Sequence, residues 1–161
     1  MNYPLTWRHD VNIDDVIVLT EIAKKTNVFN TEEISVVQEL ITDKLNRGAT
    51  SDYLFLVAEH AGNAIAFTCF GIVPLTDNRY DLYWIVVDPG YQRLQIGAAI
   101  LLKTEKIISQ QGGIHLYAET SGSALYHATR QFYDRNGYQK IAELPDYYRD
   151  GDAQVIYRKV L

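Results

Sequence analysis

The stretch "VVDPGYQRLQIGAAILLKTEK", Val86 to Lys106, joins two different patterns without a linker. An apolar strand-like run ends at Asp88-Pro89-Gly90, a glutamine-rich turn follows, and an apolar helical pattern begins at once. The unpaired N–H groups in the first turn of a helix, aided by the helix dipole, bind anions and especially phosphates. A glycine, Gly97, and several amides at the mouth of this helix therefore indicate a site for a negatively charged ligand.

This strand–turn–helix is neither of the two common nucleotide-binding loops. It contains no G-x-G-x-x-G and no G-x-x-x-x-G-K-[ST] sequence. On spacing alone it also fits an ordinary connection from strand to helix in which Gly97 is merely tolerated. The motif by itself therefore leaves both interpretations open.

The patterns on either side of this stretch predict a mixed α/β (α+β) domain built on one sheet, with the element order βααβββαβαββ. Apolar residues at helical spacing indicate four helices, over 12–27, 31–45, 96–111 and 123–137. Short apolar runs indicate strands at 3–10, 53–73, 80–88, 114–119, 138–144 and 153–161, the second of these being a hairpin.

Local signals refine this outline. Asn30 with Glu33 forms a capping-box pattern at the start of the second helix. Gly62-Asn63 is the turn expected in the hairpin, and residues 145–152 are expected to form a loop. The last helix is expected to turn three apolar side chains inward, namely Leu125, Ala128 and Phe132.

Composition indicates a single domain over residues 1–161, since most domains contain about 100 to 200 residues. The chain has 47% hydrophobic and 22% charged residues and a net charge of −5. This charge disfavours non-specific binding to nucleic acid or to an anionic membrane surface. An ordinary globular protein without either partner is expected.

The sequence also predicts a cytoplasmic protein that binds no metal. The single cysteine, Cys69, lies in an apolar run and agrees with a reducing compartment. The N-terminus lacks the apolar region of a signal peptide, and no stretch approaches the roughly 20 apolar residues of a membrane span. No metal-ligand spacing is found among the four histidines, His9, His60, His115 and His127.

Two longer motifs resemble the GNAT superfamily of acyl-CoA-dependent N-acyltransferases. They are "V-x-P-x-Y-Q-x-x-x-I-G-x-A-x-L" at Val87–Leu101 and "F-Y-x-x-x-G-Y" at Phe132–Tyr138. The likeness spans nearly the whole chain, and "LYWIVVDP" resembles one bacterial branch of unknown substrate. The resemblance implies a mainly antiparallel sheet of about seven strands flanked by four helices. It also implies acetyl-CoA as co-substrate, held between the strands at 80–88 and 114–119.

The family's loop pattern is [Q/R]-x-x-G-x-[G/A], whose backbone amides hold the coenzyme pyrophosphate. Gln92 and Gly97 match its first and last positions, while Gln95 replaces its first glycine. The Cβ of Gln95 crowds the phosphate approach, although its N–H can still donate if its φ angle is negative. The resemblance implies coenzyme contacts for the residues of this loop, with Arg93 as the nearest charged side chain: Gln92, Arg93, Leu94, Gln95, Ile96, Gly97, Ala98 and Ala99.

The helix over 123–137 is expected to place Tyr126 and Tyr133 on one face, with Thr129 and Arg130 between them. In the family the tyrosine of "F-Y" commonly acts as general acid near the thioester sulfur, and Tyr133 matches it. A tyrosine has a pKa of about 10 and a thiol about 8.5, so full proton transfer to the thiolate costs roughly 2 kcal/mol. We therefore expect Tyr133 to stabilise the leaving sulfur by a hydrogen bond. The resemblance also implies a coenzyme contact for Thr129 and Tyr133, whereas Tyr126 replaces an asparagine common in the family.

In the family, a backbone N–H from the strand segment that matches Ile85, Val86 and Val87 polarises the acetyl carbonyl. An attacking amine must be neutral, so a base is expected as well. Asp81 lies where some relatives carry a basic glutamate, and Glu119 is the other carboxylate at a strand end. Asp81 first and Glu119 second are the candidates, and an ordinary surface role for either remains open.

The resulting hypothesis is an N-acetyltransferase that moves an acetyl group from acetyl-CoA to a primary amine by direct attack in a ternary complex. The alternative is a non-catalytic acyl-CoA sensor or interaction module on the same fold, favoured by Gln95 and the missing asparagine. The acceptor could be a small molecule or a peptide amine, and the resemblance suggests a homodimer.

Overall fold

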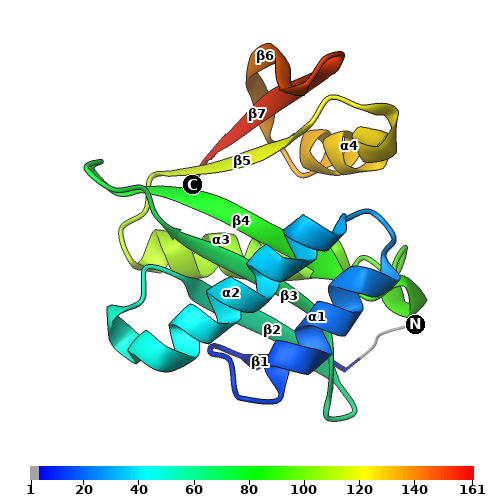
Figure 1. The fold of residues 1–161 in the computed structure, drawn as a ribbon. Coiled ribbons are helices and arrows are strands. Elements are labelled where there is room, and N and C mark those ends of the chain that lie inside the picture. The colour runs from blue at the N-terminus through cyan, green and yellow to red at the C-terminus, as the bar shows by residue number, and fades with distance from the viewer. Residues whose placement is uncertain (1–3) are drawn as a thin grey trace. The chain divides into compact units, whose positions relative to one another are not determined.

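The computed structural model describes residues 4–161 (Figure 1). Its helices are α1 (Asp15–Lys25), α2 (Thr31–Arg47), α3 (Ile96–Gln110) and α4 (His127–Arg135). Its strands are β1 (Thr6–Arg8), β2 (Leu54–His60), β3 (Asn63–Ile72), β4 (Arg79–Val87), β5 (His115–Ser121), β6 (Gln139–Arg149) and β7 (Asp152–Val160). The expected order βααβββαβαββ is confirmed. The part of the expected first strand that contains Tyr3 lies outside the described residues.

The seven strands form one mixed sheet in the order β1-β2-β3-β4-β5-β7-β6. The pairs β1–β2, β2–β3, β5–β7 and β6–β7 are antiparallel. β4 and β5 are parallel, and the register joins Arg79–Leu82 to His115–Ala118. Parallel neighbours need a crossover connection, and α3 supplies it.

The chain divides into two compact units. Unit 1 comprises residues 1–71 and 84–104, and unit 2 comprises residues 72–83 and 105–161. β4 and α3 thus contribute residues to both units. Each unit is described by itself.

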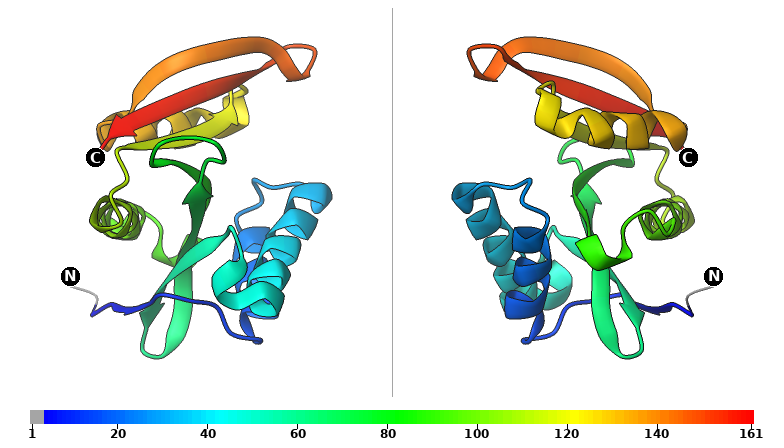
Figure 2. Two further views of the ribbon diagram at one scale, coloured as in Figure 1. Left: turned by 90° about the vertical axis from the view of Figure 1, so that its left-hand side faces the viewer. Right: turned by 90° about the vertical axis from the view of Figure 1, so that its right-hand side faces the viewer.

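In unit 1, α1 and α2 lie side by side over one face of β2 and β3 (Figures 1 and 2). The helices contribute Leu19, Ile22, Val37 and Ile41 to the core, and the strands contribute side chains such as Phe67. Burying one aliphatic side chain of this kind contributes about 1.5–3 kcal/mol. The predicted capping box is confirmed at the start of α2, where the side chains and backbones of Asn30 and Glu33 bond each other reciprocally. On the other face of β3, the hydroxyl of Thr68 forms a hydrogen bond with the hydroxyl of Thr104 in α3, and the two oxygens are 2.8 Å apart.

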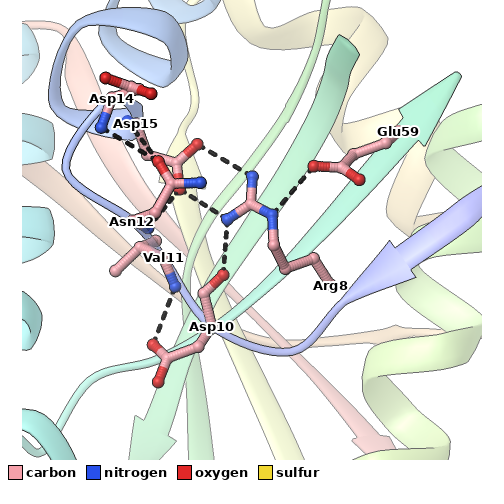
Figure 3. A network of polar contacts seen from close by, with 7 residues as sticks. All are labelled: Arg8, Asp10, Val11, Asn12, Asp14, Asp15 and Glu59. Carbon is pink, nitrogen blue, oxygen red and sulfur yellow. Dashed lines mark hydrogen bonds and ion pairs between the residues drawn. The ribbon is translucent and has the colours of Figure 1, made fainter. Parts of the chain in front are cut away.

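A buried ion pair fastens β1 to the start of α1 and to β2 (Figure 3). Arg8 donates from Nη1 to Oδ2 of Asp15 at 2.6 Å and from Nε to Oε1 of Glu59 at 2.9 Å. Asp15 in turn accepts the backbone N–H of Asn12. Because all these groups bond one another, we assign them a structural role.

Unit 2 contains β5, β6, β7, α4 and the first half of β4. Its helical residues contact one face of the strands: Tyr133 of α4 packs on Tyr157 of β7, and Glu105 of α3 bonds Lys159 of β7. By strand alternation, Leu116, Ala118 and Thr120 of β5 share this face. Their neighbours on β5 point to the opposite face, which no helix of unit 2 covers.

The structure corrects three expectations. Residues Ala124–Tyr126 form a 3-10 turn, so α4 begins only at His127. Leu125 and Ala128 are exposed, whereas Tyr133 is the buried residue of α4. The predicted inward face was therefore wrong, because aromatic packing in unit 2 selects the tyrosine.

The first correction thus concerns α4, and the other two concern the hairpin turn and the segment after Leu144. The hairpin turns at Ala61-Gly62, both with positive φ, and Asn63 already pairs with His60. Residues 145–149, expected in a loop, belong to β6, whose register with β7 shifts between Leu144 and Arg149. None of the helices in residues 4–161 is long and apolar enough to span a membrane.

Candidate active site

The turn from β4 to α3 is held by its own polar groups. The backbone N–H of Asp88 donates to the carbonyl of Ile65 at 2.8 Å, and its Oδ1 accepts the N–H of Gly90 at 2.9 Å. Gln92, the first residue of the loop pattern, donates from Nε2 to the carbonyl oxygen of Val87 at 3.1 Å. The Gln92 side chain therefore closes the turn and shapes the loop that follows.

The loop after Gln92 leaves a run of backbone donors unused. Within residues 4–161, no acceptor is found for the N–H groups from Arg93 to Ala98. Arg93 and Gln95 have positive φ angles of 60° and 63°, while Leu94 between them does not. Alternation of this kind turns successive N–H groups toward one concavity, a backbone nest suited to anions.

The start of α3 differs from the starts of the other long helices in unit 1. Glu33 and Asn30 satisfy backbone groups of α2, and α1 has Asp15 in its first turn. The first turn of α3 has no acidic residue. Exposed Arg93 forms no ion pair among the described residues. The positive end of this helix is thus left for an external anion.

Gln95 adopts a left-handed backbone conformation. The negative φ angle named above as a condition for donation by its N–H is not met, since φ is +63°, and the N–H joins the nest through the alternation of φ angles instead. This left-handed conformation costs a residue with a Cβ roughly 1–2 kcal/mol, and a glycine avoids the cost. Gln95 therefore holds, under strain, a backbone conformation that glycine adopts without this cost.

Tyr133 lies in an aromatic cluster in unit 2. Its ring centroid is 5.3 Å from that of Tyr138 and 5.4 Å from that of Tyr157. The side chain is 96% buried, yet its hydroxyl makes no hydrogen bond within the described part of the chain. Burial, and then Tyr157, raise the pKa of Tyr133 well above its usual range. Tyr133 is therefore a hydrogen-bond donor that keeps its proton.

Tyr138 gives a useful contrast to Tyr133. Its hydroxyl donates to Oε1 of buried Glu105 at 3.0 Å, while Lys159 donates to Oε2 at 2.8 Å. The polar capacity of Tyr138 is thus used inside the fold, and that of Tyr133 is not.

The two candidate bases lie on neighbouring strands of unit 2. Asp81 of β4 is half-buried, and burial followed by the charge of Glu119 raises its pKa. Glu119 of β5 is exposed and accepts a hydrogen bond from Nε2 of Gln154 at 2.6 Å. A carboxylate with a raised pKa is a better base near neutral pH than an ordinary one. Gln154 itself was missed, although alternation in "AQVIYRKVL" puts it on the same face of β7 as Arg158.

The remaining predicted residues have simpler surroundings. Val86 is buried, and Ile85 and Val87 are half-buried at the end of β4. Thr129 lies in the first turn of α4, and its side chain makes no hydrogen bond among residues 4–161. Arg130, expected on the tyrosine face, instead donates to the carbonyls of Ser121 and Ser123. No group of three or more potential metal ligands occurs in the described chain.

The structure thus brings some predicted residues together. Glu119 lies close enough to Asp81 to raise its pKa, and the loop residues share one nest in unit 1. Tyr157, which packs on Tyr133, was missed because the two residues are distant in the sequence and only the fold brings β7 against α4.

Comparison with known proteins identifies the family. The Acetyltransferase (GNAT) domain profile matches residues 51–140. A protein from Desulfovibrio desulfuricans described as a GNAT-family acetyltransferase is 36% identical, with a TM-score of 0.95 over 98% of this chain and 99% of that one. No protein of curated function matches the sequence.

More distant solved structures share the fold alone. The ribosomal-protein-S18-alanine N-acetyltransferase of Escherichia coli is 19% identical, with a TM-score of 0.78 over 98% of this chain and 94% of its own. The PaiA N-acetyltransferase of Thermoplasma acidophilum, solved with coenzyme A, is 22% identical, with a TM-score of 0.76 over 98% of this chain and 99% of its own. With the profile match and the 36% identical relative, these findings show that the chain belongs to the GNAT family of acetyltransferases.

Proposed function

We propose that this protein transfers an acetyl group from acetyl-CoA to a primary amine, and that the nest at the start of α3 binds the phosphates of the coenzyme. The observation that carries the proposal is the run of unused N–H groups from Arg93 to Ala98, with alternating φ angles and no acidic residue beside it. Backbone donors and a helix dipole are a general solution for phosphate binding. Solved relatives of this fold were crystallised with coenzyme A or acetyl-CoA.

In this proposal the chain's residues divide the work of acyl transfer. Asp81, with its raised pKa, accepts the proton that the amine must lose, directly or through water. The amine nitrogen attacks the thioester carbon, the C–S bond breaks, and the sulfur leaves as a thiolate that takes a proton from water to become the thiol of CoA. Tyr133 donates a hydrogen bond to that sulfur from its unpaired hydroxyl. A backbone N–H of Ile85–Val87 stabilises the carbonyl oxygen.

Direct attack in a ternary complex is preferred to a covalent acetyl-enzyme. Cys69, the single cysteine, is fully buried in β3, and burial raises the pKa of its thiol. A buried, protonated thiol is a poor nucleophile. The same buried, reduced cysteine agrees with a cytoplasmic location.

A thermal-shift series tests the proposal. Acetyl-CoA, free CoA and adenosine 3′,5′-bisphosphate at a hundred times their dissociation constants should each add about 2.7 kcal/mol of stability. Acetyl-CoA consumption with and without amines then measures turnover. No shift with millimolar ligand contradicts the phosphate nest, and binding without turnover on a broad amine panel supports the sensor alternative.

A further inference from the structure

One face of the strands in unit 2 carries charges of both signs that do not pair with each other. The register places Asp81 opposite Tyr117 and Tyr117 opposite Arg158. It also places Arg79 opposite His115, one step earlier on the same face. We call this surface the charged face; its members are Arg79, Asp81, His115, Tyr117, Glu119 and Arg158.

The charged face is the one that no helix of unit 2 covers. The residues of α4 and α3 in this unit contact Tyr157 and Lys159 on the opposite face. Because side chains alternate along a strand, Arg158 between them points away from both helices. The charged side chains therefore lie on the face opposite the aromatic cluster.

The positive end of the charged face lacks an internal counter-charge. Within residues 4–161, neither Arg79 nor Arg158 has a carboxylate within 4.0 Å. Arg79 donates to the backbone carbonyl of Asp77, while Nε of Arg158 is buried without any hydrogen-bond partner. Burial, then Arg79 and Arg158, lower the pKa of His115, which places both guanidinium groups within electrostatic range of one ring. A buried guanidinium N–H without an acceptor is unfavourable until an anion supplies one.

The negative end shows the converse arrangement. Asp81 and Glu119 have no cationic partner within 4.0 Å in the described chain, and Gln154 alone donates to Glu119. Burial, and then the charge of Glu119, raise the pKa of Asp81. A cation at this end would relieve that repulsion.

The strand spacing explains why Asp81 and Arg158 do not neutralise each other. Asp81 and Arg158 lie in one row, separated by the strand that carries Tyr117. Two strand spacings of about 4.8 Å put their backbones roughly 10 Å apart. A single molecule that carries both charges at this separation can satisfy both ends at once.

We propose that the acceptor is a zwitterion whose amine binds at Asp81 and Glu119 and whose carboxylate binds at Arg158, across the ring of Tyr117, with Arg79 beside His115 adding positive potential. This inference rests on the proposed function and names its substrate class. A guanidinium matches a carboxylate with two parallel hydrogen bonds. An extended chain advances about 3.3–3.6 Å per residue, so a tripeptide has the required span between its amine and its carboxylate.

Matched acceptors that differ only in the anionic group test the inference. Glycine, diglycine and triglycine are each compared with the corresponding C-terminal amide, by calorimetric binding to the CoA-saturated protein and by acetylation rate. We expect the best acid to bind and react at least tenfold better than its amide, with triglycine favoured. Equal binding of acids and amides at all three lengths, or binding of none, overturns the inference. An aminoalkyl phosphate compared with its alcohol shows whether a phosphate binds instead, which would contradict the carboxylate assignment.

Variants locate the effect on the charged face. Arg158→Gln should reduce the preference for acid over amide to near one, Arg79→Gln should reduce it partly, and Arg158→Lys should retain part of it. Lys106→Gln, an exposed α3 position with the same charge change, is the matched control and should keep the full preference. Melting temperatures check that each variant is folded. A preference that survives Arg158→Gln and Arg79→Gln contradicts the inference.

The binding and turnover measurements separate the two proposals. Arg158-dependent binding of the acid without acetylation supports the charged face and contradicts the proposed reaction. Acetylation of acids and amides at equal rates supports the reaction and contradicts the charged face.

Discussion

The nest at the start of α3 and the aromatic cluster around Tyr133 offer hydrogen-bond donors in two different ways. The nest uses backbone N–H groups, so its chemistry depends on φ angles rather than on side-chain identity, and a glutamine can stand in the place of a glycine. The cluster offers one hydroxyl, on a ring that packs against Tyr138 and Tyr157. A backbone site should therefore tolerate side-chain changes that keep the N–H, whereas the function of Tyr133 should fail when its single hydroxyl oxygen is removed.

The largest expected effect is at Tyr133. Tyr133→Phe removes the hydroxyl, and because a positioned proton donor contributes about 10²–10⁴-fold, kcat should fall at least about 100-fold. Steady-state kinetics should show little change in coenzyme affinity. The melting temperature should not fall, because the lost hydroxyl had no internal partner.

Tyr138→Phe is the matched control for this variant. It removes a hydrogen bond to a charged group, worth about 1.5–3 kcal/mol, so urea unfolding should show lower stability with kcat largely kept. If the two variants lose activity equally, the distinction between the catalytic and the structural tyrosine is wrong.

At the nest, removing one N–H should weaken coenzyme binding. Gly97→Pro deletes a donor in the first turn of α3, where proline is tolerated because no intrahelical bond is lost. Loss of a charge-assisted hydrogen bond of about 1.5–3 kcal/mol should raise the Kd for CoA by roughly 10–100-fold, as measured by calorimetry. Gly97→Ala keeps the N–H and should bind much more tightly than Gly97→Pro. Equal Kd values for the two variants would show that the backbone donor is not used.

A pH profile decides between Asp81 and Glu119, the two carboxylates of the charged face. If Asp81 must be ionised, kcat/KM is lost as pH falls through its raised pKa, so the acid limb lies above the range of an ordinary carboxylic acid. Glu119→Gln removes a repelling charge and should move this limb to lower pH, whereas Asp81→Asn should abolish it. Abolition by Glu119→Gln, with the limb retained in Asp81→Asn, would make Glu119 the base.

The smallest effect concerns strain in the nest. Gln95→Gly relieves a positive φ angle worth roughly 1–2 kcal/mol but costs about 0.5–1 kcal/mol of chain entropy, so stability should rise by about 0.5–1 kcal/mol. Chemical denaturation measures the change, with Leu94→Gly, at an exposed neighbouring residue without a positive φ angle, as the control. A loss of stability in Gln95→Gly would show that the glutamine side chain stabilises the loop.

The sequence alone was enough for the order of elements, the capping box at Asn30 and the strand–turn–helix after Asp88. These features depend on periodicity and turn chemistry within a few residues, which a single sequence displays directly. The family motif likewise identified Tyr133 as a candidate because it lies in one continuous segment.

Only the tertiary structure decided which face of α4 is buried, that Arg130 bonds backbone carbonyls, and that Gln92 closes its own turn. It also brought Glu119 beside Gln154, 35 positions away, and placed Asp81, Tyr117 and Arg158 in one row. Strand register and aromatic packing join segments that are distant in the chain, and alternation along one strand does not say which neighbour it will meet. The position of the turn before α3 could therefore be predicted from local sequence, while its positive φ angles, the surroundings of Tyr133 and the charged face could not.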